Sequence, residues 1–280
     1  MVINTNISSL TAQEASKNTS NSLSSSLEKL SSGLKINKAS DDASGLAIAD
    51  KLRTQVTSID QGVANGNSAV SLLQIADKSM AEQSTILDTI KAKLIQANTD
   101  TTSDDGRTAI AGDIAKLLEQ LTNIGEQTNY NGRQLISGSD GATAASVHTF
   151  QVGEKNTDTI TTGTINANTT GLGLGALSTA ANATLTKTIA AAQQTVVNAA
   201  ISTLNSYRAD IGSTQNQVES AVRNLMTQST NLSAAESVIR DVDYAEESAN
   251  FNKQNIISQA GSYAISQANT VQQNVLKLLQ

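Results

Sequence analysis

Residues 248–280 of this 280-residue chain, SANFNKQNIISQAGSYAISQANTVQQNVLKLLQ, carry the clearest pattern of a paired helix. Apolar or small residues recur in this stretch at alternating steps of three and four, the spacing that turns one face of a helix toward a partner helix. Gly and Ala in the middle of this seam bury little apolar area, and ordering the backbone costs about 1–2 kcal/mol per residue, so we expect the helix to be unstable alone. The predicted seam consists of Ile257, Gly261, Ala264, Ala268, Val271, Val275 and Leu278.

The N-terminal 35 residues have the same character, because they are rich in Ser, Asn and Thr and carry few charges. Residues 248–280 themselves contain only two charged residues, Lys253 and Lys277. The similarity predicts that the two ends pair as helices and leave a polar, uncharged face. A short heptad stripe marks the N-terminal partner: Leu23, Leu27, Leu30 and Leu34.

The middle of the chain predicts longer helices. From Ala49 to Leu94 a seam of fourteen positions carries ten apolar residues. At 1.5 Å per residue, a helix over 43–98 would be roughly 80 Å long, which exceeds the diameter of a compact globule of this size. A further seam follows the turn-rich residues 99–106, and another lies between Val197 and Leu232. We therefore predict a mainly α protein, an elongated antiparallel bundle of long, coiled-coil-like helices formed by both chain ends.

An insert interrupts the helical pattern. Asn131-Gly132 predicts a tight turn, and 134–136 and 149–152 predict short strands, so a small β-hairpin or loop insert is expected at the far end. The segment 139–183 is rich in Gly, Ser, Thr, Asn and Ala, which predicts a short, variable, surface-exposed and replaceable region. The expected domains are thus 1–42 with 236–280, a terminal coiled coil disordered until assembly, and 43–138 with 184–235, a helical bundle.

Charge and hydropathy exclude several classes of partner. The net charge is −6 and no basic run is present, which argues against nucleic acid. No apolar run approaches the roughly 20 residues of a membrane span, so no membrane insertion is expected. The N-terminus shows no basic region followed by an apolar core, and a Sec-type signal peptide is not expected.

The residues that could carry catalysis have simpler explanations. The single histidine, His148, cannot form a two-histidine metal site and is expected to be structural or solvated. Gly171-Leu-Gly-Leu-Gly175 lacks the spacing and the Lys-Ser/Thr of a phosphate loop, so it predicts a turn. We therefore expect that the protein is not an enzyme and that it binds neither a cofactor nor a metal ion. Three acidic pairs fall where helices should begin, which indicates capping: Asp41/Asp42, Asp104/Asp105 and Asp241/Asp243.

Several longer motifs resemble bacterial flagellin. They are VINTN (2–6), LEKLSSGL (27–34), INKASDDASGLAIA (36–49), QTNYNG (127–132), DYA (243–245) and QANTVQQNVLKLL (267–279). The likeness covers residues 1–138 and 184–280. One departure is Gln272, where many relatives have Pro, and a helix runs through Gln more easily.

The resemblance implies a structural subunit of the bacterial flagellar filament, secreted to the cell exterior. Flagellins are exported unfolded through the flagellar type III apparatus and assemble at the tip under a cap protein. Their disordered ends pair on polymerisation and line a central channel, while the insert faces outward and is often O-glycosylated. The implied partners are other copies of the chain in a helical homopolymer, an export chaperone, the filament cap and hook-junction proteins.

Two alternatives from other classes remain open. A hook–filament junction protein has flagellin-like ends, and copy number per filament would distinguish it. An enzymatic flagellin with a protease insert would need a zinc motif, which this insert does not contain.

The resemblance also bears on an innate-immune receptor. Many flagellins are recognised by a Toll-like receptor through a surface built around Arg-x-x-x-Leu-x-x-Gln on the first long helix and a Glu on the next. Here these positions are Thr89, Lys93, Gln96 and Asp113. Losing the guanidinium and the apolar anchor implies weak or no recognition.

Overall fold

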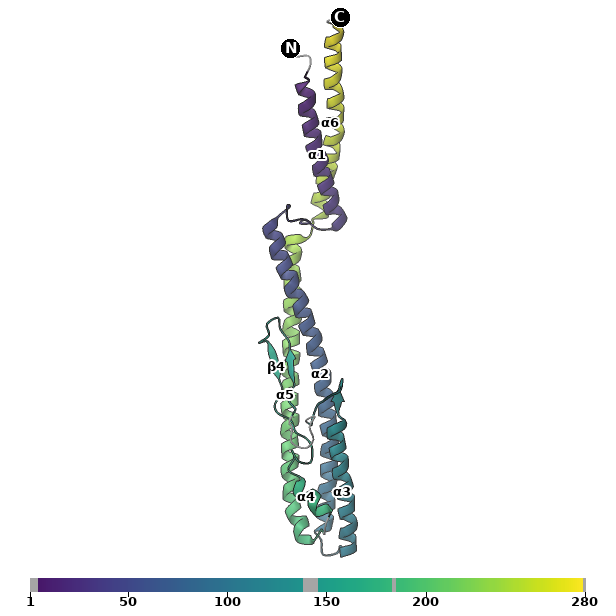
Figure 1. The fold of residues 1–280 in the computed structure, drawn as a ribbon, viewed down its shortest axis with the longest axis vertical. Coiled ribbons are helices and arrows are strands. Elements are labelled where there is room, and N and C mark those ends of the chain that lie inside the picture. The colour runs from purple at the N-terminus through teal and green to yellow at the C-terminus, as the bar shows by residue number, and fades with distance from the viewer. Residues whose placement is uncertain (1–4, 138–145, 183–184, 279–280) are drawn as a thin grey trace. The chain divides into compact units, whose positions relative to one another are not determined.

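The computed structural model describes residues 5–137, 146–182 and 185–278, and it divides into two compact units (Figure 1). The first contains residues 1–56 and 230–280, and the second contains residues 57–229. Two helices, α2 (Ala43–Ala97) and α5 (Lys187–Arg240), contribute to both units. Within each unit long helices pack antiparallel, and two small hairpins supply strands. The predicted class, mainly α with a small hairpin insert, is confirmed.

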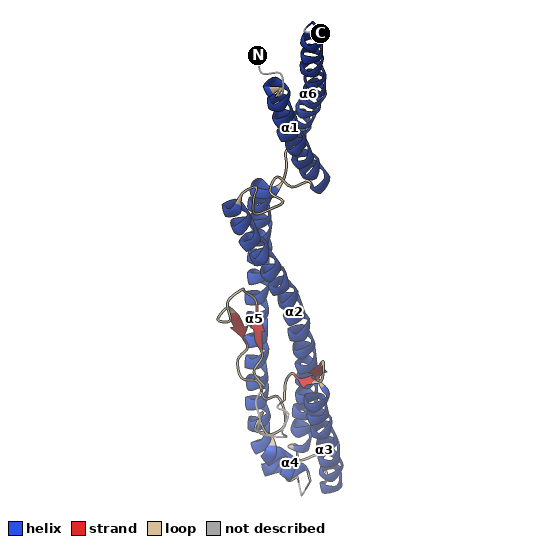
Figure 2. Ribbon diagram, turned by 45° about the horizontal axis from the view of Figure 1, so that its top comes forward, coloured by secondary structure: helices blue, strands red, loops and turns tan. Residues whose placement is uncertain are grey.

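In the first unit, α1 (Ile7–Ser32) and α6 (Tyr244–Leu278) lie side by side and antiparallel, as Figures 1 and 2 both show. The Asn6 side chain caps α1 by accepting a hydrogen bond from the backbone N–H of Ser9 at 3.0 Å. Gly33, with φ of 74°, ends that helix in the left-handed conformation that favours glycine.

Short connections join the ends of this unit. Leu34 pairs with Asp241 in an antiparallel bridge, the Lys35 N–H donates to the Arg240 carbonyl at 2.6 Å, and the Val242 N–H donates to the Gly33 carbonyl at 3.0 Å. These bonds tie the segment after α1 to the segment between α5 and α6.

The predicted capping acids are found at two of the three helix starts. Asp42 accepts from the N–H groups of Ser44 and Gly45 at the start of α2, and Asp243 accepts from the second and third residues that follow it at the start of α6. Helix α3 (Asp104–Gln127) differs, because Ser103 supplies its cap and Asp104 pairs with Arg107 instead.

The second unit has a continuous core among α2, α3 and α5. Its fully buried side chains come from all three helices, including Met80 and Leu87 of α2, Ile114 of α3 and Leu204 of α5. A smaller cluster lies where the second hairpin covers α2 and α5: Ala69, Val152, Ile160, Val218 and Val222.

The hairpins follow the turn residues closely. β1 (Asn129–Tyr130) pairs with β2 (Arg133–Gln134) around Asn131 and Gly132, both with positive φ, as the Asn-Gly pair predicted. β3 (Thr149–Gln151) pairs with β4 (Thr159–Thr161). The strand predicted over 134–136 ends at Gln134, because Leu135 and Ile136 enter the core as irregular backbone.

The exposure predicted for the insert is wrong in its described part. Ile165, Leu172, Leu174 and Leu177 are buried in the main core, the last on the short helix α4 (Gly175–Ala181). The Gly171–Gly175 stretch is a turn, as predicted, yet it turns both of its leucines inward. Its irregular backbone has no period, so sequence patterning could not identify these core residues. Positions 139–145 and 183 of the predicted insert lie outside the described residues.

The predicted seam of α2 is correct at every seventh residue from Ile59 to Leu94, where Leu73, Met80 and Leu87 are among the buried residues. Of the alternate positions, Ala49 is buried as predicted, whereas those from Val63 to Lys91 are half-buried and the residue before each of them is buried instead. Three of these neighbouring positions hold small residues, and at Gly62 the helix and the hairpin approach closely, because an added Cβ would lie 2.5 Å from the Val152 carbonyl oxygen. The buried neighbours are Gly62, Ala69, Ala76, Gln83 and Ile90.

Candidate assembly surface

The first unit exposes far more large apolar side chains than it buries. Among its described residues, Ile36 and Ala49 are the only buried apolar side chains. A folded unit normally buries most of its large aliphatic residues, so this distribution makes the exposed apolar residues of the unit a candidate assembly surface. The exposed large apolar residues of this unit are Ile7, Leu10, Leu27, Ile48, Val238, Tyr244, Ile256, Ile257, Tyr263 and Val271.

The faces that α1 and α6 turn toward each other consist mostly of small or polar residues, with a few large apolar residues among them. The Asn6 side-chain amide donates to the Ala268 carbonyl at 3.1 Å, and the Ser26 hydroxyl bonds the Glu247 carboxylate. At Gly261 an added Cβ would lie 3.8 Å from the Ser16 Cβ, so the two helices approach closely. The residues of α6 that are half-buried along this contact are Phe251, Ser258, Gly261, Ile265, Ala268 and Gln272.

Some of the predicted seam residues lie on the inner face of the helix pair, where α1 and α6 meet, and others lie on its outer, exposed face. On α1 and just after it, Leu23, Leu30 and Leu34 are half-buried, whereas Leu27 is 57% exposed. On α6, Ala268 is half-buried and Ile257, Ala264 and Val271 are exposed. The side chains of Val275 and Leu278 lie outside the described residues.

Apolar spacing alone did not reveal which face of α6 meets α1. The inner face includes Ser258 and Gln272, which a search for apolar residues passes over. The outer face carries the larger side chains Ile257, Tyr263 and Val271. The helix pair therefore has mostly small and polar residues inside and leaves several bulky apolar residues outside. The large apolar residues that are half-buried inside are Leu23, Leu30, Phe251 and Ile265.

The four receptor-related positions lie in the second unit, on α2 and α3. Thr89 and Gln96 are exposed, and the Thr89 hydroxyl donates to the Thr85 carbonyl at 2.9 Å. Lys93 and Asp113 form an ion pair with an N–O distance of 2.6 Å. Positions 89, 93 and 96 share one face of α2, because residues three and four apart are neighbours on a helix.

The residues considered for catalysis are structural. His148 is buried and its ring bonds the Leu135 carbonyl oxygen at 2.9 Å. In the described ranges no group of three or more His, Cys, Asp or Glu side chains could hold a metal ion. No helix within those ranges is long and apolar enough to cross a membrane.

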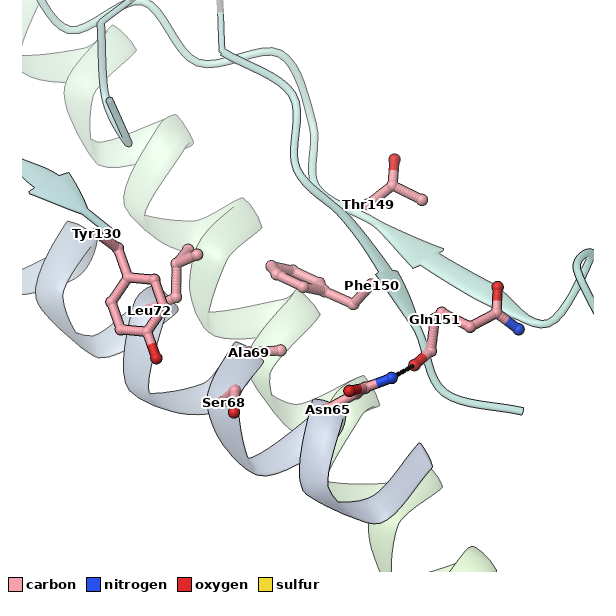
Figure 3. Close-up of a pocket in the computed structure, with 8 residues that line it drawn as sticks. All are labelled: Asn65, Ser68, Ala69, Leu72, Tyr130, Thr149, Phe150 and Gln151. Carbon is pink, nitrogen blue, oxygen red and sulfur yellow. Dashed lines mark hydrogen bonds between the residues drawn. The ribbon is translucent and has the colours of Figure 1, made fainter. Parts of the chain in front are cut away.

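A groove of about 240 Å³ lies beside the second hairpin (Figure 3). Asn65 and Leu72 of α2 line one side, and Phe150 and Gln151 of β3 line the other. The Asn65 side-chain amide donates to the Gln151 carbonyl at 3.1 Å, which holds the strand on the helix. All the lining residues are uncharged, and they come from separate segments of the chain, so sequence inspection did not identify the groove.

Comparisons with known proteins give a consistent picture. Residues 3–141 match the family model of the bacterial flagellin N-terminal helical region, and residues 194–279 match that of the bacterial flagellin C-terminal helical region. Flagellin from Bacillus subtilis (strain 168) is 36% identical, and the flagellar filament 30.7 kDa core protein of Treponema maltophilum is 34% identical, each over 100% of both chains. The solved structure of a putative flagellar hook-associated protein from Vibrio parahaemolyticus has a TM-score of 0.59, covering 71% of this chain and 99% of that one. At 12% identity it shows similarity of fold alone.

Proposed function

This chain belongs to the bacterial flagellin family, and from that premise we propose that it polymerises into the extracellular flagellar filament through its paired terminal helices. The relatives that match it over their whole length are named as flagellin and as a filament core protein. The family membership therefore supports a role as a filament subunit, and we propose that the paired terminal helices are the part of the chain through which it assembles.

The observation that supports this proposal is that the first unit exposes most of its large apolar side chains and buries few of them. Full burial of one large aliphatic side chain stabilises by about 1.5–3 kcal/mol, and in a free chain this unit leaves side chains such as Ile7, Ile256 and Val271 in water. Neighbouring copies would cover them in a polymer. We further propose that residues 1–42 and 236–280 are disordered in the free monomer and become helical on assembly, because the contact between α1 and α6 fully buries no large apolar side chain among the described residues and so stabilises the pair too little to order it.

The partners follow from the same family membership. The chain would leave the cell unfolded by the flagellar type III route, held beforehand by an export chaperone, and join the filament beneath the cap. Hook-junction proteins would contact its first copies. The uncharged Asn, Gln and Ser residues of α6 would then give a transiting unfolded chain few charges to bind.

A hook–filament junction protein is the alternative. The hook-associated structure supports it through fold alone. Full-length identity of 36% and 34% to a flagellin and a filament core protein favours the filament subunit.

Polymerisation of the purified full-length monomer tests the proposal. On salting out, the unmodified chain should form long filaments by negative-stain microscopy and sedimentation. Ile257→Asp, which places a charge on the outer face of α6, and deletion of the last twenty residues should both prevent filaments while the second unit keeps its cooperative thermal transition. Asn252→Asp adds the same charge at an exposed polar position of α6 and should assemble normally. Filaments of ordinary stability from the truncated chain or from Ile257→Asp would contradict assembly through these helices.

Hydrogen exchange on the monomer tests the disorder. Amides of α1 and α6 should exchange near intrinsic rates, while those of α2 and α3 in the second unit remain protected. Protection of the terminal helices in the monomer would contradict the proposed coupling of folding to assembly.

A further inference from the structure

His148 occupies a buried position in the second unit. It precedes β3, its residue is 3% exposed, and it is the chain's single histidine. Its Nε2 lies 2.9 Å from the Leu135 carbonyl oxygen. Because a carbonyl oxygen only accepts, Nε2 carries the proton in this contact and Nδ1 carries a lone pair. Nδ1 is buried and, among the described residues, has no hydrogen-bond partner.

Residues 133–137, here called the 133–137 strip, make a series of hydrogen bonds with residues 146–165, the hairpin segment. The His148 imidazole is part of this series. The Arg133 guanidinium donates to the Val147 carbonyl at 3.1 Å, and the Ser146 hydroxyl donates to the Ser137 carbonyl at 2.8 Å. The His148 backbone N–H donates to the Thr162 hydroxyl at 2.9 Å. His148 therefore links the strip to both strands of the hairpin.

The surroundings oppose a positive charge on this ring. Burial lowers the pKa of His148 below its ordinary value, with the nearby Arg133 guanidinium acting in the same direction and the bond to Leu135 opposing it. Within the described ranges, no carboxylate is among the groups that shift this pKa. Protonation would add an N–H without an acceptor and a second cation beside Arg133.

We propose that His148 is a proton-operated latch that holds the 146–165 hairpin against the 133–137 strip while the imidazole is neutral and releases it when Nδ1 is protonated. The step is a proton uptake from solvent, with no covalent change. The smaller core cluster, which includes Val152 and Ile160, would open with the hairpin.

The direction of the pH dependence follows from linkage. An unfolded or released histidine has a pKa of about 6.5, and the latched one has a lower pKa. The stability that the latch contributes is complete above about pH 6.5 and falls as the pH drops, until the latched pKa is reached. One proton raises the opening constant by up to about tenfold per pH unit in that range. Asp and Glu have reference pKa values near 3.9 and 4.3, so among the side chains pH 5.5–7.5 mainly titrates the histidine, and the His148→Gln variant controls for the N-terminal amine.

Hydrogen exchange of the full-length monomer, corrected for intrinsic rates, tests the latch at pH 7.5 and 5.5. Peptides from 146–165 should open several-fold more at pH 5.5, up to about tenfold, while peptides from 204–218 of α5 serve as an internal reference. His148→Gln keeps an N–H donor near the Nε2 position and cannot be protonated, so its exchange should not change across this window. Equal protection of 146–165 at both pH values, or the same pH dependence in His148→Gln, would overturn the proposal.

A second measurement remains decisive even where the Gln variant fails to fold. The single imidazole can be titrated by NMR in the unmodified chain. Its midpoint should fall below 6.5, with the neutral Nε2–H tautomer at pH 7.5. A midpoint at or above 6.5 means that protonation does not weaken the contact and contradicts the latch.

Discussion

The side-chain amide nitrogen of Gln83 donates to the carbonyl oxygens of Ala167, at 2.7 Å, and of Leu121, at 3.1 Å. Gln83 lies on α2, is fully buried, and by these two bonds joins α3 and the segment that follows the second hairpin to the long helix. A polar residue thus occupies a core position of α2, where it donates to the irregularly placed Ala167 carbonyl.

Replacing this donor should destabilise the second unit. Gln83→Leu removes both bonds and leaves the buried Ala167 carbonyl oxygen without this donor, at a cost of about 1–3 kcal/mol, whereas the Leu121 carbonyl remains within the hydrogen-bond ladder of α3. The thermal midpoint followed by circular dichroism should fall by several degrees, since each kcal/mol shifts a unit of this size by about 2–4 °C. Gln74→Leu, at an exposed position of the same helix, is the matched control and should change little. An unchanged midpoint in Gln83→Leu would show that the two bonds contribute nothing to stability.

The insert should behave as part of the core. Leu174 is fully buried, and Leu174→Ala should destabilise the second unit by about 2–5 kcal/mol, whereas Thr164→Ala at an exposed position should be nearly neutral. A Gly/Ser linker in place of the described part, 146–182, should therefore remove the cooperative transition of the unit. Chemical denaturation of the monomer measures both effects. A linker variant with wild-type cooperativity would restore the original expectation that the insert is replaceable.

The sequence predicted the fold class because long 3–4 spacing has few alternative explanations. Leu73, Met80 and Leu87 were placed correctly in the core, since large aliphatic residues at every seventh position seldom face water. Ala69 and Gln83 were missed for opposite reasons. Ala69 is a small residue in the cluster beneath the second hairpin, and a small side chain gives a weak apolar signal. Gln83 is polar because it donates to buried backbone carbonyls.

The candidate assembly surface could be predicted only in part. Periodicity indicates which residues share a helix face, but it does not indicate whether that face meets α1 or another copy. Ile257 and Val271 share a seam pattern with Ala268, yet only Ala268 is half-buried against the partner helix. Leu172 and Leu174 lie in an irregular turn, where no period exists to reveal burial.

Two glycines in long helices should respond oppositely to the same substitution. Gly62→Ala places a Cβ 2.5 Å from the Val152 carbonyl oxygen, so the hairpin must move, and a loss of about 1–3 kcal/mol is expected. Gly112→Ala on α3 meets nothing within 4 Å and should stabilise by about 0.5–1 kcal/mol through lower backbone entropy in the unfolded chain. Thermal midpoints of the two variants, measured side by side, should move in opposite directions. Stabilisation by Gly62→Ala would show that helix and hairpin separate without cost.

The last prediction concerns the Toll-like receptor that senses many flagellins. By resemblance, Thr89 and Lys93 stand where that surface has its Arg and its Leu, and losing a central Arg anchor commonly costs at least about 2 kcal/mol, or about thirtyfold in affinity. Lys93 is also engaged by Asp113, in a partly exposed ion pair that contributes at most about 1 kcal/mol to stability. We therefore expect Thr89→Arg with Lys93→Leu to fold normally and to raise signalling from a weak baseline in reporter cells.

The matched control is Thr108→Arg with Lys116→Leu on α3. Thr108, like Thr89, is an exposed threonine that donates to the carbonyl four residues earlier, and Lys116, like Lys93, belongs to an ion pair. This control changes charge and apolarity by the same amount at positions outside the Arg-x-x-x-Leu-x-x-Gln motif, so it should leave signalling at the baseline. The prediction fails if the unmodified monomer is as potent as a flagellin that carries the Arg-x-x-x-Leu-x-x-Gln motif. It also fails if both double variants raise signalling equally, since the effect would then come from general surface chemistry rather than from positions 89 and 93.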